Sequence, residues 1–359
     1  MTLNINSFKD KNIVCIGFSP WKREALSLFL ERKNLRFIKH FHNNLNPNTD
    51  HLIIWASNKT IPLEQSLINS GFNYHYCEDG FMRSSGLGIK LFIPGSLSFS
   101  KNGIHFDSTK ETELENLLNN VTLTSQEKDR AHTIIEFIKQ RNISKYGNLG
   151  QEPFPKIENN NKNILIIGQV ENDASLEFGS PNIKRNKDFI ENVINNTEKS
   201  NLFYKPHPDV VAKLRPGEVS KSYLQENNVV EIQNTPLSEC INSCDEVHVL
   251  SSQSGLDALI LNKKVICYGV PFYSGWGLTT DKNTTERREK KLSLEELIYV
   301  SFVKYPTYVN PKTKKKCEIE EILELISNKD FKWPHAPFWM QSLVKIKREY
   351  LKVKNEFIN

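Results

Sequence analysis

Short apolar runs alternate with helical segments along this chain, and this alternation occurs twice, which restricts the fold more than any other feature. Residues 12–19 read NIVCIGFS, a short apolar and β-branched run that is typical of a buried strand. Ser19 and Pro20 then favour a helix start, and a helical pattern continues to residue 33. Strands that alternate with helices form parallel sheets covered by helices, so the sequence predicts an α/β fold.

The two series are separated by residues 147–163, which are rich in Gly, Pro and Asn and are typical of a linker. Before this linker, the pattern predicts strands at 12–19, 36–41, 51–57, 73–77 and 97–106 and helices at 21–33, 62–70 and 125–141. After it, the pattern predicts strands at 164–170, 202–205, 229–232, 247–250 and 265–268 and helices at 186–196, 237–244 and 256–261.

We therefore expect three parts in this chain. Residues 1–155 form an N-terminal αβ domain, residues 156–335 form a C-terminal αβ domain, and residues 336–359 carry a helix that crosses back over both. Two Rossmann-like αβ domains that face a central cleft describe a GT-B-like arrangement.

The net charge excludes little, because 47 basic and 42 acidic residues give only +5. This value is too small to indicate nucleic acid as a partner, but it suits an anionic donor or an anionic membrane surface. The first residues do not resemble a signal peptide, and no run approaches the roughly 18 apolar residues of a spanning helix, so we expect a cytoplasmic protein. The six cysteines form no CxxC pair, and we interpret them as buried thiols.

Two carboxylates, Glu78 and Asp79, stand where a predicted strand ends. Strand ends of this kind face the ligand crevice in open α/β sheets, and a carboxylate there could act as base or nucleophile. Arg83 could form a forked pair with a substrate carboxylate, and Gly86 would let the backbone approach a ligand. The same residues are equally compatible with a turn that has a surface Asp and a structural Arg.

Another polar strand end follows the linker, where Gln169 could bind a nucleobase or sugar and Glu171 or Asp173 could handle protons. The alternative is a polar loop in which Asp173 or Ser175 caps a helix.

Residues 204–208 read YKPHP, so two prolines fix His207 directly after a strand, next to Lys205. An imidazole held in this way could donate to a phosphate or protonate a leaving group.

Hydroxyl groups gather at a later helix start, where Ser251, Ser252, Ser254 and Gly255 could bind a phosphate through hydroxyls and free backbone N–H groups. Ordinary capping by serine is the alternative and is compatible with phosphate binding.

Glycines and aromatic residues alternate just beyond, in residues 268–279. Tyr273 and Trp276 could stack on a sugar or base, or the loop could simply pack on the core.

Several chemistries lack their motifs in this sequence. It contains no Asp-x-Asp pair for a metal on a nucleotide diphosphate, no GxxxxGK[ST] loop and no HExxH. No metal site is therefore expected.

Taken together, these segments resemble the KpsC-type capsule polysaccharide β-Kdo transferases (Kdo is 3-deoxy-manno-octulosonic acid). The residues that carry the resemblance are EDGFMRSSGLG (78–88), QVENDAS (169–175), KPHP (205–208), SSQSGLDAL (251–259), YGVPFYSGWGLTTD (268–281) and YPTYVNP (305–311). The resemblance implies a GT-B-like fold, CMP-Kdo as donor on the C-terminal domain, and retention at the anomeric carbon. It implies that Asp79 is the nucleophile of a double displacement and that His207 lies near the donor phosphate.

The resemblance also implies the partners, a glycan or lipid-linked glycan acceptor and no nucleic acid. No cofactor or metal is required, because CMP-Kdo has one phosphate. Family members often carry two such modules, and this chain carries one.

Lysines in residues 312–316 could contact the inner membrane, or they could form an ordinary solvated charged face. Capsule assembly enzymes are further candidate partners. The rival functions are transfer from CMP-sialic acid or a UDP-sugar, and a non-catalytic capsule assembly protein that retains the fold.

Overall fold

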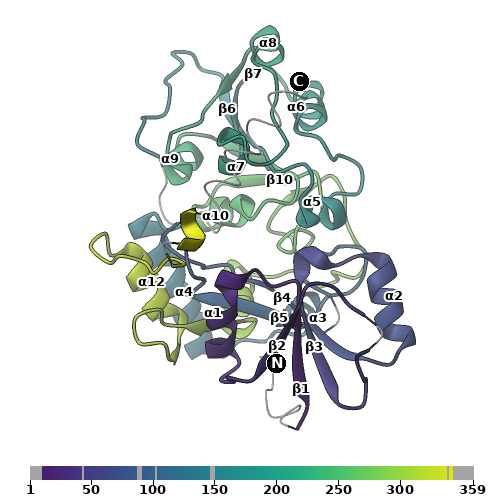
Figure 1. The fold of residues 1–359 in the computed structure, drawn as a ribbon. Coiled ribbons are helices and arrows are strands. Elements are labelled where there is room, and N and C mark those ends of the chain that lie inside the picture. The colour runs from purple at the N-terminus through teal and green to yellow at the C-terminus, as the bar shows by residue number, and fades with distance from the viewer. Residues whose placement is uncertain are drawn as a thin grey trace.

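Two sheets with their own helices form the molecule in the computed structural model, one in the lower and one in the upper half of Figure 1. The structure describes residues 10–42, 44–86, 91–101, 103–145, 150–337 and 339–342. The expected α/β class with two facing sheets is confirmed.

The first sheet has seven strands in the order β13-β12-β5-β4-β3-β1-β2. Its strands are β1 (Asn12–Ile16), β2 (Leu35–Ile38), β3 (Asp50–Trp55), β4 (Asn73–Asp79), β5 (Ser96–Ser100), β12 (Pro306–Val309) and β13 (Lys316–Cys317). Strands β1 to β4 are parallel, whereas β5 runs antiparallel to β4. Strand β4 extends two residues beyond the prediction and thereby carries Glu78 and Asp79 at its carboxyl end.

The helices of this half are α1 (Arg23–Phe29), α2 (Ile61–Asn69), α3 (Glu113–Asn119) and α4 (Ser125–Arg141), with a 3-10 turn at Pro20–Lys22. Helix α4 has the predicted bounds because its ends are encoded locally. The Thr124 hydroxyl accepts from the backbone N–H of Glu127, and the Glu127 carboxylate accepts from the N–H of Thr124, which is a capping box. Asn142 ends the helix in the left-handed conformation.

The second sheet has six strands in the order β11-β10-β9-β6-β7-β8, and all its pairs are parallel. Its strands are β6 (Lys162–Ile167), β7 (Ser200–Lys205), β8 (Val229–Glu231), β9 (Glu246–Val249), β10 (Lys264–Cys267) and β11 (Thr280–Asp281). Its helices are α5 (Ala174–Gly179), α6 (Asn186–Asn195), α7 (Pro208–Val211), α8 (Lys221–Glu226), α9 (Leu237–Asn242) and α10 (Ser254–Ile260).

The chain then returns to the first sheet, which differs from the predicted domain that continues to residue 335. Helix α11 (Leu294–Ile298) and a π-helical turn lead into β12, which pairs with β5 and covers its otherwise open edge. Helix α12 (Ile319–Ser327) then packs beside α4. This pairing joins residues about 200 positions apart, so no local sequence pattern indicates it.

The predicted final helix lies mostly outside the described residues, which include only positions 339–342 of it in helical form. Before it, the buried Trp333 donates from its indole N–H to the carbonyl of Ile93, so this segment does pack back on the first half. Among the described residues, no helix has the length and hydropathy that a membrane span requires.

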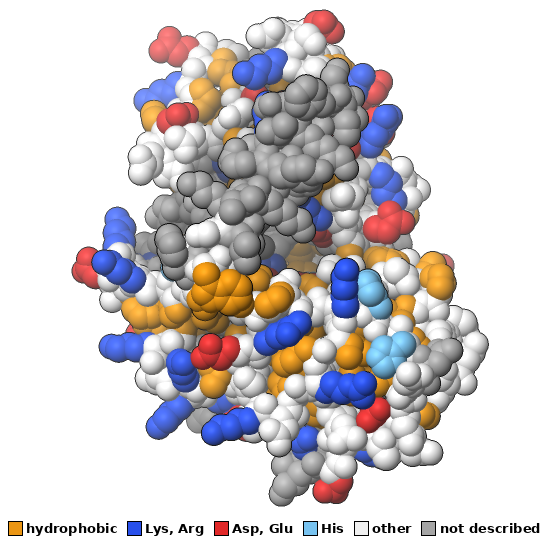
Figure 2. Space-filling view, viewed as in Figure 1, with side chains coloured by type: hydrophobic (Ala, Val, Ile, Leu, Met, Phe, Trp, Pro, Cys, Tyr) orange, Lys and Arg blue, Asp and Glu red, His pale blue; other side chains and the backbone are white. Residues whose placement is uncertain are grey.

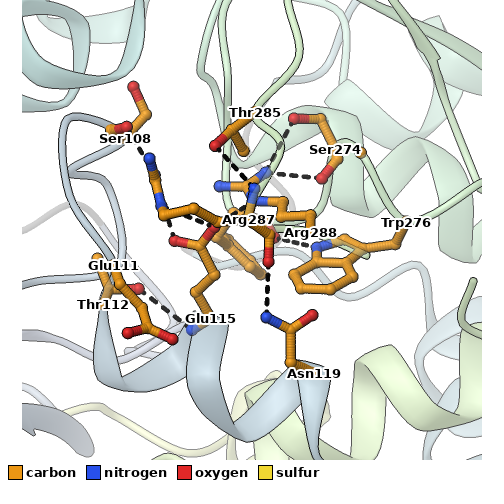
Figure 3. Close-up of polar contacts among 12 residues, drawn as sticks. Ser108, Glu111, Thr112, Glu115, Asn119, Ser274, Trp276, Thr285, Arg287 and Arg288 are labelled. Carbon is orange, nitrogen blue, oxygen red and sulfur yellow. Dashed lines mark hydrogen bonds and ion pairs between the residues drawn. The ribbon is translucent and has the colours of Figure 1, made fainter. Parts of the chain in front are cut away.

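A buried polar joint connects the two halves behind the cleft (Figure 3). Arg288 and Arg287, from the loop after β11, both approach one carboxylate oxygen of Glu115 on α3 at 3.4 Å. Arg288 also donates to the carbonyl of Ser274 at 2.6 Å and to that of Pro271. The joint thus fixes the loop after β10 against the first half.

Candidate active site

One large cavity lies between the two sheets and is lined by residues of both halves. Its volume is about 2040 Å³, well above the roughly 300–1,000 Å³ of typical small-molecule sites, so it has room for more than one small ligand. The carboxyl ends of β4, β6, β7 and β9 all point to it, as expected for ligand sites in open α/β sheets. The predicted site residues that line it are Glu78, Asp79, Gln169, Asp173, Lys205, His207, Ser251, Ser252 and Ser254.

Asp79 is held between two cations. Its Oδ2 accepts from the guanidinium Nε of Arg83 at 2.8 Å, and its Oδ1 accepts from the ammonium of Lys22 at 3.2 Å. Burial opposes ionisation, but the charges of Arg83, Lys22 and Lys145 outweigh it and hold the pKa of Asp79 below its ordinary value. Asp79 is therefore an ionised carboxylate at neutral pH.

Glu78 has the opposite tendency. Burial, and next the negative charge of Asp79, raise the pKa of Glu78 to about 7. One Glu78 oxygen accepts from the backbone N–H of Asp79 at 3.0 Å. Two adjacent carboxyl groups whose environments separate their pKa values are the arrangement that acid–base chemistry needs.

Arg83 does not face the cavity as predicted, because it is fully buried and is not among the described residues that line the cavity. Its guanidinium donates to Asp79, to the hydroxyl of Ser84 at 2.8 Å and to the carbonyl of Phe92 at 2.8 Å. Gly86 packs against another part of the protein and not against the cavity, since an added Cβ would lie 2.4 Å from the Phe92 ring. Arg83 thus supports Asp79 from outside the lining, and Gly86 packs next to Phe92.

Gln169 lies at the cavity wall and joins the ends of β6 and β9. Its side-chain N–H donates to the hydroxyl of Ser251 at 3.1 Å, and its carbonyl accepts from the backbone N–H of Ser251 at 2.8 Å. The amide orientation follows from these two hydrogen bonds.

The two remaining acidic candidates are engaged structurally. Glu171 accepts from the backbone N–H of Asn186 at 2.8 Å and is absent from the described lining. Asp173 caps α5 through Ser175 and pairs with Arg215 at 2.9 Å. Burial opposes ionisation of Asp173, but the hydrogen bonds from Ser175 and the charge of Arg215 lower its pKa, so it is a weak base.

His207 caps α7 by accepting the backbone N–H of Asp209 at its Nδ1, 3.1 Å away. This hydrogen bond assigns the proton of the neutral ring to Nε2. Burial lowers the pKa of His207, so the ring is a neutral donor at neutral pH. The Lys205 ammonium donates to the carbonyl of Thr235 at 2.6 Å, and burial lowers its pKa.

The serines at the start of α10 line the cavity, where the Ser252 hydroxyl accepts from the backbone N–H of Ser254 at 3.2 Å. Gly255 lies behind them, because an added Cβ would be 2.1 Å from the hydroxyl of Tyr273.

Tyr273 and Trp276 do not offer ring faces to a ligand, contrary to the prediction, since both are fully buried behind the lining. Tyr273 donates to the carbonyl of Ser252, and Trp276 donates to the carbonyl of Phe272 at 2.8 Å. They pack the loop against the core, which is the alternative left open by the sequence.

Lining residues to which the sequence analysis assigned no role include Trp21, Lys22, Trp55, Lys145, Gln253 and Asp257. Trp21 and Lys22 lie in the turn that follows β1, and Trp55 is the last residue of β3. Their positions at strand ends could have suggested them. Lys145 influences titrating groups of both halves, including Asp79 and His207. The Gln253 amide crosses between the halves and donates to the carbonyl of Phe81 at 2.8 Å.

Comparison with known sequences links this chain to surface-polysaccharide proteins. The sequence model described as "Capsule polysaccharide biosynthesis protein" matches residues 50–310. The capsule polysaccharide modification protein LipA of Neisseria meningitidis is 32% identical over 95% of this chain and 50% of its own length. The lipopolysaccharide-processing protein LpsZ of Rhizobium meliloti is 31% identical over 87% of this chain and 73% of its own length. The chain thus spans about half the length of LipA.

Two solved structures share the fold, and both come from Thermosulfurimonas dismutans KpsC. The β-Kdo 2,7-transferase has a TM-score of 0.73 and 32% identity, covering 89% of this chain and 99% of that chain. The β-Kdo 2,4-transferase has a TM-score of 0.76 and 27% identity, covering 89% of this chain and 98% of that chain.

Proposed function

The chain belongs to the capsule polysaccharide biosynthesis protein family, and from this premise we propose that it is a retaining β-Kdo transferase. In this proposal it moves Kdo from CMP-Kdo to a glycan acceptor. The names of the two similar KpsC structures support the sugar class. The observation that carries the proposal is the pair Glu78 and Asp79, one protonatable and one ionised, at the cleft opposite His207.

The donor lies with its nucleotide on the second half. The Nε2–H of His207 and the hydroxyls of Ser252 and Ser254 can donate to the single phosphate. Donors fixed before the reaction stabilise the charge that develops on the departing CMP. CMP-Kdo has no diphosphate to be bridged, so transfer without a metal remains our prediction.

The reaction proceeds in two displacements. An oxygen of Asp79 attacks the anomeric carbon C2, and the electron pair of the C2–O bond leaves with the phosphate of CMP. An acceptor hydroxyl then attacks C2 and displaces Asp79, and its proton passes to Glu78. Two inversions give net retention, by the same logic as in retaining glycosidases.

Glu78 is the base of choice among the three acidic candidates. Its pKa of about 7 lets it take a proton at neutral pH, whereas hydrogen bonds from Ser175 and the charge of Arg215 hold Asp173 ionised. Glu171 is bound to the backbone of α6 outside the described lining.

The test is incubation with CMP-Kdo and defined glycan acceptors, with the product anomer determined by NMR. Wild-type protein should form a β-Kdo linkage, and Asp79→Asn should abolish transfer while CMP still raises the melting temperature. Asp173→Asn is the matched control and should retain most activity. Full turnover by Asp79→Asn would remove Asp79 from the chemistry.

Assays with the same protein distinguish the rival functions. Thermal shifts with CMP, CDP, UMP and UDP distinguish a CMP-sugar donor from a UDP-sugar, and CMP-sialic acid in the transfer assay tests the other acid sugar. A non-catalytic assembly protein would bind glycan but transfer none of these sugars.

Contact with the inner membrane remains a separate prediction. Figure 2 shows Lys and Arg side chains scattered over the first half on this face, with apolar side chains between them. In the lysine-rich segment 312–316, however, Lys314 pairs with Glu24 and Lys316 pairs with Glu31, both at 2.9 Å. Binding to anionic vesicles that salt weakens would support this contact.

A further inference from the structure

The largest apolar core of this molecule is continuous from the first half to the second. One cluster of buried side chains contains residues of α3, α4 and α11 from the first half and of β6, β7, β9 and β10 from the second. Helix α4 links the two parts, since it contacts α11 and α12 of the first half and α10 of the second. Each half also has smaller clusters of its own, but the halves share this core, unlike domains that pack loosely against each other.

Packing at this junction leaves almost no free space. Ile138 and Ile143, near the end of α4, border the same gap as Ile241 of α9 and Leu261, which follows α10. The gap has a volume of about 10 Å³, which is the least that one water molecule requires. A rotation of one half against the other would have to open this contact and expose its apolar side chains to water, which is unfavourable.

Hydrogen bonds also cross directly between the halves at the cavity. The Phe178 carbonyl, near the end of α5, accepts from the backbone N–H of Ser108 at 3.2 Å and from its hydroxyl at 2.8 Å. The Gln253 amide, at the start of α10, donates to the carbonyl of Phe81 at 2.8 Å. Because Phe178, Gln253 and Phe81 line the cavity, these contacts fix the spacing of its walls.

The chain crosses between the halves twice, and hydrogen bonds hold both crossings where the structure describes them. In the linker, the backbone N–H groups of Gln151 and Glu152 donate to the carbonyl of Asn234, at 2.7 and 3.1 Å. In the return crossing, Arg288 is held by Glu115, as Figure 3 shows. Hinges consist of a few loop or terminal residues that absorb large changes in backbone torsion, and these contacts oppose such changes.

We propose that the cleft is preformed, so that the two halves bind and release substrates as one rigid body. Closure of two domains about a hinge is a general way to enclose a ligand. Here a hinge rotation would disrupt the shared core and the hydrogen bonds of Ser108 and Gln253. This inference goes beyond the proposed function, because it holds for any nucleotide sugar.

A preformed cleft changes what binding requires. No fraction of the molecules has to change state before a donor binds, so the affinity is not reduced by a population of open molecules. The end of β4 and the start of α10 keep the same relative position with and without a donor. Movements that accompany the reaction are then confined to side chains and loops.

Double electron–electron resonance between spin labels tests the rigid cleft. One pair of labels joins the halves, at Ile68→Cys on α2 in the lower half of Figure 1 and Gln225→Cys on α8 in the upper half. The reference pair, Ile68→Cys with Asp129→Cys on α4, lies within the first half, and all three positions are exposed. Cys317→Ser provides the background, because the other five native cysteines are buried.

The pair between the halves should give one distance distribution as narrow as that of the reference pair. Saturating CMP should shift its mean by less than about 2 Å. A broader or two-peaked distribution without ligand, or a larger shift with CMP, would overturn the rigid cleft. If a labelled variant does not fold, small-angle X-ray scattering of the unlabelled protein makes the same comparison, since closure would lower the radius of gyration.

Thermal shift with CMP separates this inference from the proposed function. A protein whose melting temperature CMP does not raise would contradict the proposed function. The width of the unliganded distribution would still decide for or against the rigid cleft, because a hinged molecule samples several distances without any ligand.

Discussion

Glu78 and Asp79 are neighbours in one strand, yet their surroundings shift their proton equilibria in opposite directions. Asp79 contacts Lys22 and Arg83, whereas Glu78 is half-buried beside the charge of Asp79. The difference is one of partners, since both residues end the same strand. The proposed roles of nucleophile and base can therefore be tested by substituting one of the two residues at a time.

Replacement of Glu78 by Gln should lower kcat about 10²–10⁴-fold, because the acceptor hydroxyl then lacks its base. The wild-type rate should rise as pH increases through about 7, since the base must be ionised. This rise should be missing in the variant. Steady-state kinetics from pH 5.5 to 8.5 measure both effects, and an unchanged pH profile in Glu78→Gln would assign the base elsewhere.

Asp257, in the first turn of α10, should make stability depend on pH. Burial raises the pKa of Asp257 to about 7, and its Oδ1 accepts no hydrogen bond from the part of the chain that the structure describes. Because the folded pKa exceeds the unfolded one, this stabilising contribution is complete below about pH 4 and is lost as pH rises to about 7.

Asp257→Asn should therefore become more stable relative to wild type over this pH range, by about 1 kcal/mol or more at pH 7.5. Thermal unfolding at pH 4.5, 6 and 7.5 measures the difference. A difference that is constant with pH would contradict the assigned protonation.

Strand-end residues could be predicted from the sequence, but the direction of each side chain could not. The sequence placed Asp79, His207 and Ser252 at the cleft, because the order of strands and turns locates the carboxyl edge. It could not distinguish Arg83 or Trp276 from lining residues, because their burial depends on tertiary contacts, such as those with Phe92 and Arg288, that no sequence pattern indicates.

Among the helices and strands, a prediction was confirmed where residues close in the sequence determine the bounds of the element. Helix α4 has the predicted bounds, since Thr124 and Glu127 form the capping box and Asn142 ends the helix. Strand β12 was not predicted to join the first sheet, because its hydrogen-bonding partner β5 lies about 200 residues earlier in the chain.

Replacement of Thr124 by Ala should reduce the free energy of unfolding by about 1 kcal/mol, because the N–H of Glu127 loses its acceptor. Thr122→Ala, at an exposed position two residues before, is the matched control and should change stability by less than about 0.5 kcal/mol. Urea unfolding monitored by circular dichroism compares them; equal effects would mean that the cap does not stabilise α4.

At the scale of the whole molecule, the two halves are joined by buried contacts as well as by the linker. Phe81 of the first half stacks on Phe272 of the second with ring centres 4.4 Å apart. The Glu115 joint in Figure 3 fixes the same loop from the other side. The position of Asp79 relative to His207 therefore depends on these contacts.

Glu115→Gln should destabilise the protein by about 3 kcal/mol, because it removes the carboxylate that pairs with buried Arg288. The control is Arg130→Met, which breaks a part-exposed pair with Glu320 between α4 and α12 and should cost less than about 1 kcal/mol. Guanidinium unfolding quantifies both. Equal losses would indicate that the joint contributes no more than a surface pair.

The central claim is that a carboxylate of the first sheet takes the sugar from a donor held on the second. Intact mass and peptide mapping of the protein, incubated with CMP-Kdo and no acceptor, test it most directly. The account predicts the mass of one Kdo residue added at Asp79, absent from Asp79→Asn and removed when acceptor is supplied. A β-linked product formed at full rate by a protein that never carries sugar at Asp79 would contradict it.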